Sequence, residues 1–247
     1  MRIHYEVIGD GPPLVLVHGW GASAHRNWVD LGWVEVLAPV RRLVLMDSRG
    51  HGRSDPAPTQ AGYGYAAMGE DVLQVLDQLE LARADLFGYS MGAFIGASLL
   101  GHHRDRFSSM VLGGIGDETE ESAAKCHLIA RALRADHPTE IEEAEGRAYR
   151  RYVDADPGND REALAQSALQ MWPEGYPLVL GGDGLREVDI PVLVVDGADD
   201  HPYVDTVEKL VAVIPGAELV TIPDTDHHTV VGDARFKAAV LEFFSRQ

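Results

Sequence analysis

The stretch ADLFGYSMGAFIGASLL, residues 84–100, decides the fold class of this chain. Its apolar start is typical of a short strand, and its run of small and apolar residues at the end predicts a helix. Ser90 lies between Gly88 and Gly92 at the junction, which is the pattern of a nucleophile elbow, a tight turn with no room for bulk beside the serine. We therefore expect the Ser90 hydroxyl to be exposed above the edge of a sheet.

Apolar runs of strand length alternate with helix-like segments, which indicates an α/β fold with a mostly parallel sheet flanked by helices. The runs are rich in Val and Leu, as in strands that are buried on both faces. Seven strands are expected, at residues 3–8, 14–18, 43–47, 85–89, 109–113, 192–196 and 218–222. The spacing of apolar residues predicts helices at residues 65–81, 204–214 and 234–244.

Residues 117–187 interrupt this alternation, because they contain no convincing strand. Pro and Gly residues separate three helical segments there, at residues 120–135, 139–153 and 160–171. We expect residues 1–116 and 188–247 to form the core, and residues 117–187 to form a helical lid over the carboxyl edge of the sheet, where open α/β folds bind ligands. A helical decoration remote from the site is the alternative.

A serine hydroxyl is a weak nucleophile without a base and an acid to orient that base. The strand at 192–196 leads into the acids Asp199 and Asp200, and two histidines, His227 and His228, follow the last expected strand. The order serine, acid, histidine along the chain is one of the known orders of a serine triad. Ser90 is therefore expected to act with one acid and one histidine from these two pairs.

The glycines of His18-Gly19-Trp20-Gly21 follow the strand at 14–18 and would let a backbone N–H point into the site. We expect the N–H groups of Trp20 and Met91 to form an oxyanion hole. His18 is expected to pack and shape this loop.

The chain resembles the α/β-hydrolase fold family over nearly its whole length. In that family the acid usually lies in a Gly-x-x-Asp turn, which corresponds to Asp200, with Asp199 and Asp117 as alternatives. The base lies in Pro-x-x-Gly-His, which corresponds to His227, with His228 as the alternative and Asp226 where the glycine usually stands. The resemblance also implies a structural role for residues 47–54. It implies that the family's first strand is missing here, which places the helical insert between strands 6 and 7 of the family's count.

The composition limits the classes of partner. Asp and Glu number 39 against 21 Lys and Arg, a net charge of −18, which argues against nucleic acids and anionic membrane surfaces. Cys126 is the only cysteine, so no internal disulfide can form, and the polar start of the sequence leads us to expect no signal peptide. A cytoplasmic location is expected, and the sequence indicates no oligomeric state.

The resemblance implies a hydrolase of small carboxylic esters that works through an acyl-enzyme, with no cofactor and no metal. Trp20, Tyr89 and Trp172 are expected to contact the small-molecule substrate. A carbon–carbon bond hydrolase and a lactonase would use the same triad, and a non-catalytic receptor on the same fold is an alternative of another class. A carbon–carbon hydrolase for anionic substrates would need a cation in its pocket, for which the candidates are Arg147, Arg150 and Arg151.

Overall fold

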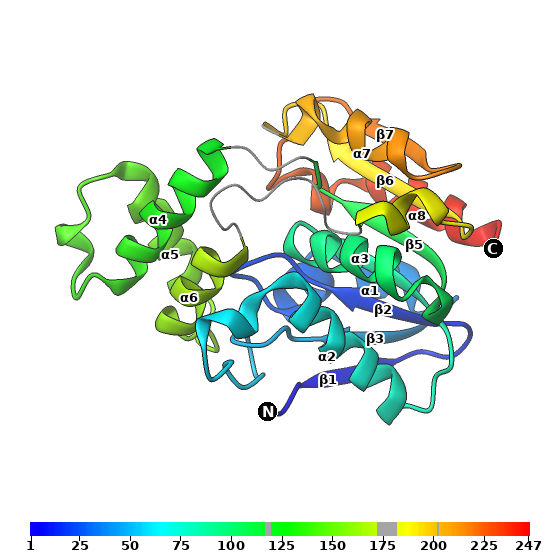
Figure 1. Cartoon of the computed structure of the whole chain (residues 1–247), viewed down its shortest axis with the longest axis horizontal. Helices are drawn as coiled ribbons and strands as arrows, with labels where there is room; N and C mark the ends of the chain where they lie inside the picture. The colour runs from blue at the N-terminus through cyan, green and yellow to red at the C-terminus, as the bar shows by residue number, and fades with distance from the viewer. Residues whose placement is uncertain (117–119, 172–181, 202) are drawn as a thin grey trace.

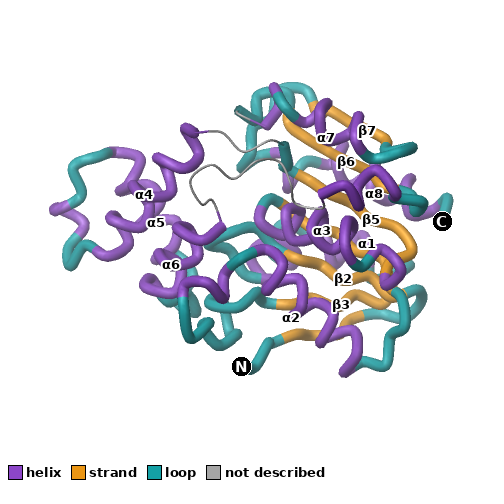
Figure 2. The backbone as a smooth tube through the Cα atoms, viewed as in Figure 1, coloured by secondary structure: helices purple, strands orange, loops and turns teal. Residues whose placement is uncertain are grey.

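A sheet of seven strands forms the centre of the molecule (Figures 1 and 2). The computed structural model describes residues 1–116, 120–171, 182–201 and 203–247. The strands are β1 Tyr5–Ile8, β2 Pro13–Val17, β3 Arg42–Met46, β4 Ala84–Tyr89, β5 Phe107–Gly113, β6 Val192–Gly197 and β7 Glu218–Ile222. Their order is β1-β3-β2-β4-β5-β6-β7, and only the pairing of β1 with β3 is antiparallel. The predicted α/β class with a mostly parallel sheet is confirmed.

Helices cover both faces of the sheet, as the apolar strands predict. The helices of the described residues are α1 Trp33–Leu37, α2 Tyr65–Gln78, α3 Met91–His102, α4 Glu120–Arg134, α5 Ala144–Asp154, α6 Arg161–Met171, α7 Val207–Val213 and α8 Ala234–Ser245. Alternate strand residues enter two cores: Val15 and Val17 pack with α2, α3 and α7, whereas Leu14 and Leu16 pack with α1 and α8. None of the helices in the described ranges is long and apolar enough to cross a membrane.

An aromatic cluster anchors β4, the strand that leads to Ser90. The ring of Phe87 lies 4.8 Å from Trp28, 4.7 Å from Trp33 and 5.6 Å from Phe236, measured between ring centroids. All four side chains are fully buried. Burial of each such ring stabilises the fold by about 2–3 kcal/mol, so the end of β4 has a well-defined position.

The three helices α4, α5 and α6, which we call the insert helices, lie between β5 and β6 in the chain. They are grouped at the left of Figure 1, beyond the ends of the strands. Hydrogen bonds between described residues tie this insert to the core. Asn159 Nδ2 donates to the Gly21 carbonyl at 2.9 Å, and Arg26 Nη1 donates to the Tyr152 carbonyl at 2.7 Å.

One predicted helix begins later than expected, and one short helix was not predicted. The helix predicted at 139–153 begins only at Ala144, because Pro138–Glu140 forms a separate 3-10 turn that the His137 side chain caps. The short helix α1 was not predicted, since five residues carry too little periodic pattern to be recognised.

Candidate active site

Ser90 occupies a strained turn between β4 and α3. Its φ of 51° and ψ of −117° are rare for a residue with a side chain. A Cβ atom on Gly88 would lie 2.2 Å from the Gly92 carbonyl oxygen, and one on Gly92 would lie 2.0 Å from the Val17 carbonyl oxygen. The backbone packing therefore requires glycine at both positions, as an elbow does.

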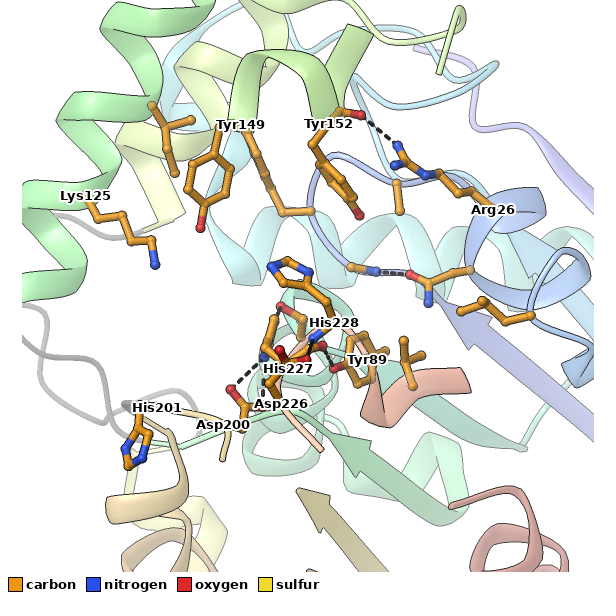
Figure 3. A pocket seen from close by; sticks show the side chains of 18 of the residues that line it. Arg26, Tyr89, Lys125, Tyr149, Tyr152, Asp200, His201, Asp226, His227 and His228 are labelled. Carbon is orange, nitrogen blue, oxygen red and sulfur yellow. Dashed lines mark hydrogen bonds and ion pairs between the residues drawn. The ribbon is translucent and has the colours of Figure 1, made fainter. Parts of the chain in front are cut away.

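The structure brings Ser90, His227 and Asp200 together at the carboxyl ends of β4, β7 and β6. Figure 3 shows Asp200 beside His227. His227 Nε2 lies 2.9 Å from Ser90 Oγ, and His227 Nδ1 lies 2.9 and 3.1 Å from the two carboxylate oxygens of Asp200. Asp200 is buried, whereas the His227 side chain is 27% exposed. Because Nδ1–H donates to a carboxylate, Nε2 is left free to accept the Ser90 proton.

Asp199 and His228 line the same cavity as Asp200 and His227, but they occupy different positions in it. The Asp199 side chain is exposed, and its backbone N–H donates to the Thr225 carbonyl. The His228 ring projects into the cavity, 5.8 Å from the His227 ring, and burial followed by the charge of His227 lowers its pKa. Asp117 lies outside the described residues.

Asp226 closes the turn that carries His227. Its Oδ1 accepts the backbone N–H groups of His228 at 3.0 Å and Thr229 at 2.9 Å, and the Thr229 hydroxyl at 2.7 Å. The bonds with Thr229 lower the pKa of Asp226. An aspartate thus stabilises this turn where the family usually has glycine.

The loop after β2 is held by buried polar contacts. The Gly19 N–H donates to Asn27 Oδ1 at 2.9 Å. His18 Nδ1 contacts the Gly19 carbonyl at 2.8 Å, and His18 Nε2 accepts the Ser48 N–H at 3.0 Å. Burial lowers the pKa of His18, so the ring is neutral with its proton on Nδ1. The sequence pattern gave no reason to single out Asn27, whose side chain accepts a hydrogen bond from Gly19, eight residues earlier in the chain.

Met91 follows Ser90 in the chain, and Trp20 lines the same cavity as Ser90. Met91 is the first residue of α3, where helix geometry leaves N–H groups without partners. Within the described ranges, neither the Met91 nor the Trp20 N–H donates a hydrogen bond to the backbone. These are the two donors predicted for the oxyanion hole.

The loop at 47–54 is tied to the loop after β2 by a buried carboxylate. Asp47 accepts the N–H of Ala24 at 2.8 Å and of Arg53 at 3.0 Å. These bonds fix the position of one loop relative to the other.

A cavity of about 460 Å³ opens above Ser90 and His227. The core provides one wall and the insert helices provide the other, through Lys125, Cys126, Ile129, Tyr149 and Tyr152. Figure 3 shows Tyr149 and Tyr152 projecting from α5 toward His228. A substrate at Ser90 would therefore touch both parts of the chain.

A family model described as the alpha/beta hydrolase fold matches residues 12–143. The chain belongs to the alpha/beta hydrolase fold family. A protein of Variovorax paradoxus (strain S110), provisionally named carbamate hydrolase RutD, is 34% identical to this α/β-hydrolase, over 100% of this chain and 97% of its own.

Solved structures agree with this assignment. A hydrolase from Pseudomonas aeruginosa PA01 has a TM-score of 0.79 at 28% identity, over 98% of this chain and 94% of its own. The enol-lactonase from Burkholderia xenovorans LB400 has a TM-score of 0.75 at 25% identity, over 98% of this chain and 96% of its own.

Two of the three side chains predicted to contact substrate line the cavity of this α/β-hydrolase. Trp20 packs edge-on against Tyr149, with 6.2 Å between ring centroids. Tyr89 is buried and its hydroxyl donates to the His227 carbonyl, so it also supports the histidine loop. Trp172 lies outside the described residues.

The candidates named for a pocket cation, Arg147, Arg150 and Arg151, are not among the described residues that line the cavity. Arg147 donates to the carbonyls at 141 and 142, Arg150 binds Asp154 and the carbonyls at 132 and 135, and Arg151 is exposed. The helical repeat is the reason, since Tyr149 and Tyr152 occupy the face of α5 that meets the cavity.

Two other cations line the cavity, Arg26 and Lys125. The Arg26 guanidinium lies 4.0 Å from the Tyr152 ring centroid. Lys125 Nζ lies 3.3 Å from a carboxylate oxygen of Glu145 and 5.6 Å from the centroid of Tyr149. Burial opposes the charge of Lys125, but Tyr149 and Glu145 outweigh burial and raise its pKa. In the described ranges, no group of three or more His, Cys, Asp and Glu side chains is placed to hold a metal ion.

Proposed function

We propose that this α/β-hydrolase cleaves small carboxylic esters by nucleophilic catalysis at Ser90. The observation that carries the proposal is the hydrogen-bonded series from Ser90 Oγ through His227 to the buried carboxylate of Asp200. All three side chains line the same cavity.

The proposed reaction begins when His227 Nε2 takes the Ser90 proton and Ser90 Oγ attacks the ester carbonyl carbon. The N–H groups of Trp20 and Met91 bind the oxyanion, and loss of one such donor costs about 3–4 kcal/mol in the transition state. His227 then protonates the leaving alkoxide, which leaves an acyl group on Ser90. Water, deprotonated by His227, releases the acid and restores Ser90.

The cavity supports small substrates. Its volume of about 460 Å³ lies toward the lower end of the ligand-site range of about 300–1,000 Å³. Because α4 and α5 supply one wall, we propose that residues 117–187 act as the lid of the site. Acyl chains of a few carbons fit such a space better than long ones.

The test is hydrolysis of p-nitrophenyl esters from acetate to laurate by the wild type and by Ser90→Ala. We expect kcat/KM to peak at short acyl chains and kcat to fall by several orders of magnitude in Ser90→Ala. Titration with a serine-directed phosphonate counts the competent sites. A labelled serine with negligible turnover on every ester would overturn the proposal and favour the receptor.

Carbamate hydrolysis is a second candidate, and the whole-length similarity to the provisionally named carbamate hydrolase supports it. A carbamate presents the same carbonyl to Ser90 with a less electrophilic carbon. Comparison of kcat/KM on p-nitrophenyl acetate, an aryl N-methylcarbamate and a γ-lactone separates the candidates. Higher kcat/KM on the carbamate or the lactone would replace the ester as the preferred substrate class.

A further inference from the structure

A second carboxyl group, that of Asp196, lies buried beside Asp200. Asp196 is in β6, four residues before Asp200, and is fully buried. Its Oδ1 accepts the Gly197 N–H at 3.0 Å, and its carboxyl group is within hydrogen-bond reach of that of Asp200. The mechanism proposed above leaves this group without a role.

The contact between the two carboxyl groups requires a proton. Two ionised carboxylates can only accept hydrogen bonds, so they would repel each other in this buried position. Asp196 Oδ2 is buried and has no partner that donates to it among the described residues. A proton on Oδ2 turns the contact into a hydrogen bond and satisfies that oxygen, while Oδ1 remains the acceptor for Gly197.

The proton belongs to Asp196 because Asp200 accepts the His227 Nδ1–H with both of its oxygens. Burial, followed by the hydrogen bond with Asp200 and the charge of Asp200, raises the pKa of Asp196 far above its ordinary range. Among the described residues, the other titratable groups beside the pair are His227 and Tyr89, and burial raises the Tyr89 pKa so that its hydroxyl stays neutral.

We propose that Asp196 is a positioning residue, a neutral carboxylic acid whose O–H donates to the Asp200 carboxylate and holds that carboxylate against His227 Nδ1. This inference rests on the proposed function, because the carboxylate it positions is the acid of the proposed triad. It also gives the buried pair a single negative charge, the amount that the imidazolium of His227 balances. A second negative charge there would separate the two acids.

The test compares Asp196→Asn with Asp196→Val. The Asn amide retains a donor toward Asp200 and an acceptor for the Gly197 N–H, whereas Val fills the space with neither. We expect kcat on p-nitrophenyl acetate at neutral pH to stay near the wild-type value in Asp196→Asn. In Asp196→Val we expect kcat to fall on the order of tenfold to a hundredfold with little change in KM. At alkaline pH the wild type should lose kcat as Asp196 ionises, and Asp196→Asn should not.

The downfield proton NMR signal of His227 Nδ1–H gives a readout that needs no turnover. We expect the signal to persist in Asp196→Asn and to shift or broaden in Asp196→Val. Wild-type kcat and an unchanged signal in Asp196→Val would overturn the inference, as would equal losses in both variants at wild-type stability. If Asp196→Val does not fold, two results decide: whether the wild type loses kcat at alkaline pH while Asp196→Asn does not, and whether the His227 Nδ1–H signal persists in Asp196→Asn. A wild type without esterase activity would overturn the proposed function, and the NMR comparison would still test the positioning.

Discussion

Gly92 lies directly against the carbonyl of Val17, so that a Cβ atom on Gly92 would fall 2.0 Å from the Val17 oxygen. The contact joins the start of α3 to the end of β2. Both partners are backbone, so neither can turn away by a change of rotamer. The position of Ser90 above the sheet thus depends on close packing between a helix and a strand that is far from it in sequence.

Gly92→Ala is expected to lower the free energy of unfolding by about 3 kcal/mol, because the overlap can be relieved only by moving backbone. Gly96→Ala, on the same helix, is the matched control. Its Cβ would meet only side-chain ends of Leu112 and Leu86, at 2.8 and 3.0 Å, and alanine has the higher helix propensity. Urea unfolding measures both variants. Similar losses would show that backbone contact is not what demands glycine at the elbow.

Asp200→Asn is expected to lower kcat on p-nitrophenyl acetate by about 10⁴-fold, because an amide cannot hold His227 in its working tautomer. Asp199→Asn removes a neighbouring exposed carboxylate and should stay within about threefold of the wild type. Steady-state kinetics at neutral pH compares the two variants. The reverse order of effects would transfer the role of the acid to Asp199.

His51 makes the fold sensitive to acid. Burial, followed by the electrostatic interaction with the neighbouring His18, lowers the pKa of His51 to about 3, from an ordinary value of 6.5. Between these values the unfolded chain binds a proton that the folded chain excludes, so stability falls as the pH drops below about 6.5. From about pH 7 to 5.5 this group should cost about 1 kcal/mol of unfolding free energy.

His51→Asn tests this dependence, because an amide can replace the contact of Nδ1 with the Arg49 carbonyl at 3.0 Å but does not titrate. Urea unfolding should show a smaller loss on acidification in His51→Asn than in the wild type. His25→Asn, at an exposed histidine, is the control and should follow the wild type. Parallel curves for all three proteins would contradict the prediction.

Lys125 should favour acyl groups that end in a carboxylate. Lys125→Met is expected to raise KM for such a p-nitrophenyl ester about threefold to fivefold, and to leave KM for the neutral ester of the same length unchanged. The effect is small because Glu145 already pairs with Lys125 at 3.3 Å. Lys209→Met, at an exposed lysine on α7 outside the cavity lining, is the control. Equal changes in KM for both esters would show that Lys125 contributes by packing and not by its charge.

Patterns that repeat along the chain were readable from the sequence. All seven strands appear where apolar runs predict them. The strands β2 to β6 are buried along most of their length, and a strand buried on both faces needs such a run. The pattern Gly88-x-Ser90-x-Gly92 predicts the elbow, since a strained turn restricts residue types locally. The start of α5 was predicted too early, because a 3-10 turn and an α-helix share similar apolar spacing over a few residues.

Only the tertiary structure decided which side chains of the site contact one another. Asp199 and Asp200 are adjacent, as are His227 and His228, and residue type cannot say which side chain of each pair turns toward Ser90. The orientation of α5 about its own axis places Tyr149 and Tyr152 at the cavity, and its arginines do not line the cavity. The pairing of Asp196 with Asp200 depends on burial, which gives an ordinary acidic residue a proton that its sequence context does not reveal. The sequence by itself determined the order and kind of the elements, because local sterics and periodic burial act over a few residues, and the fold decided which side chains meet.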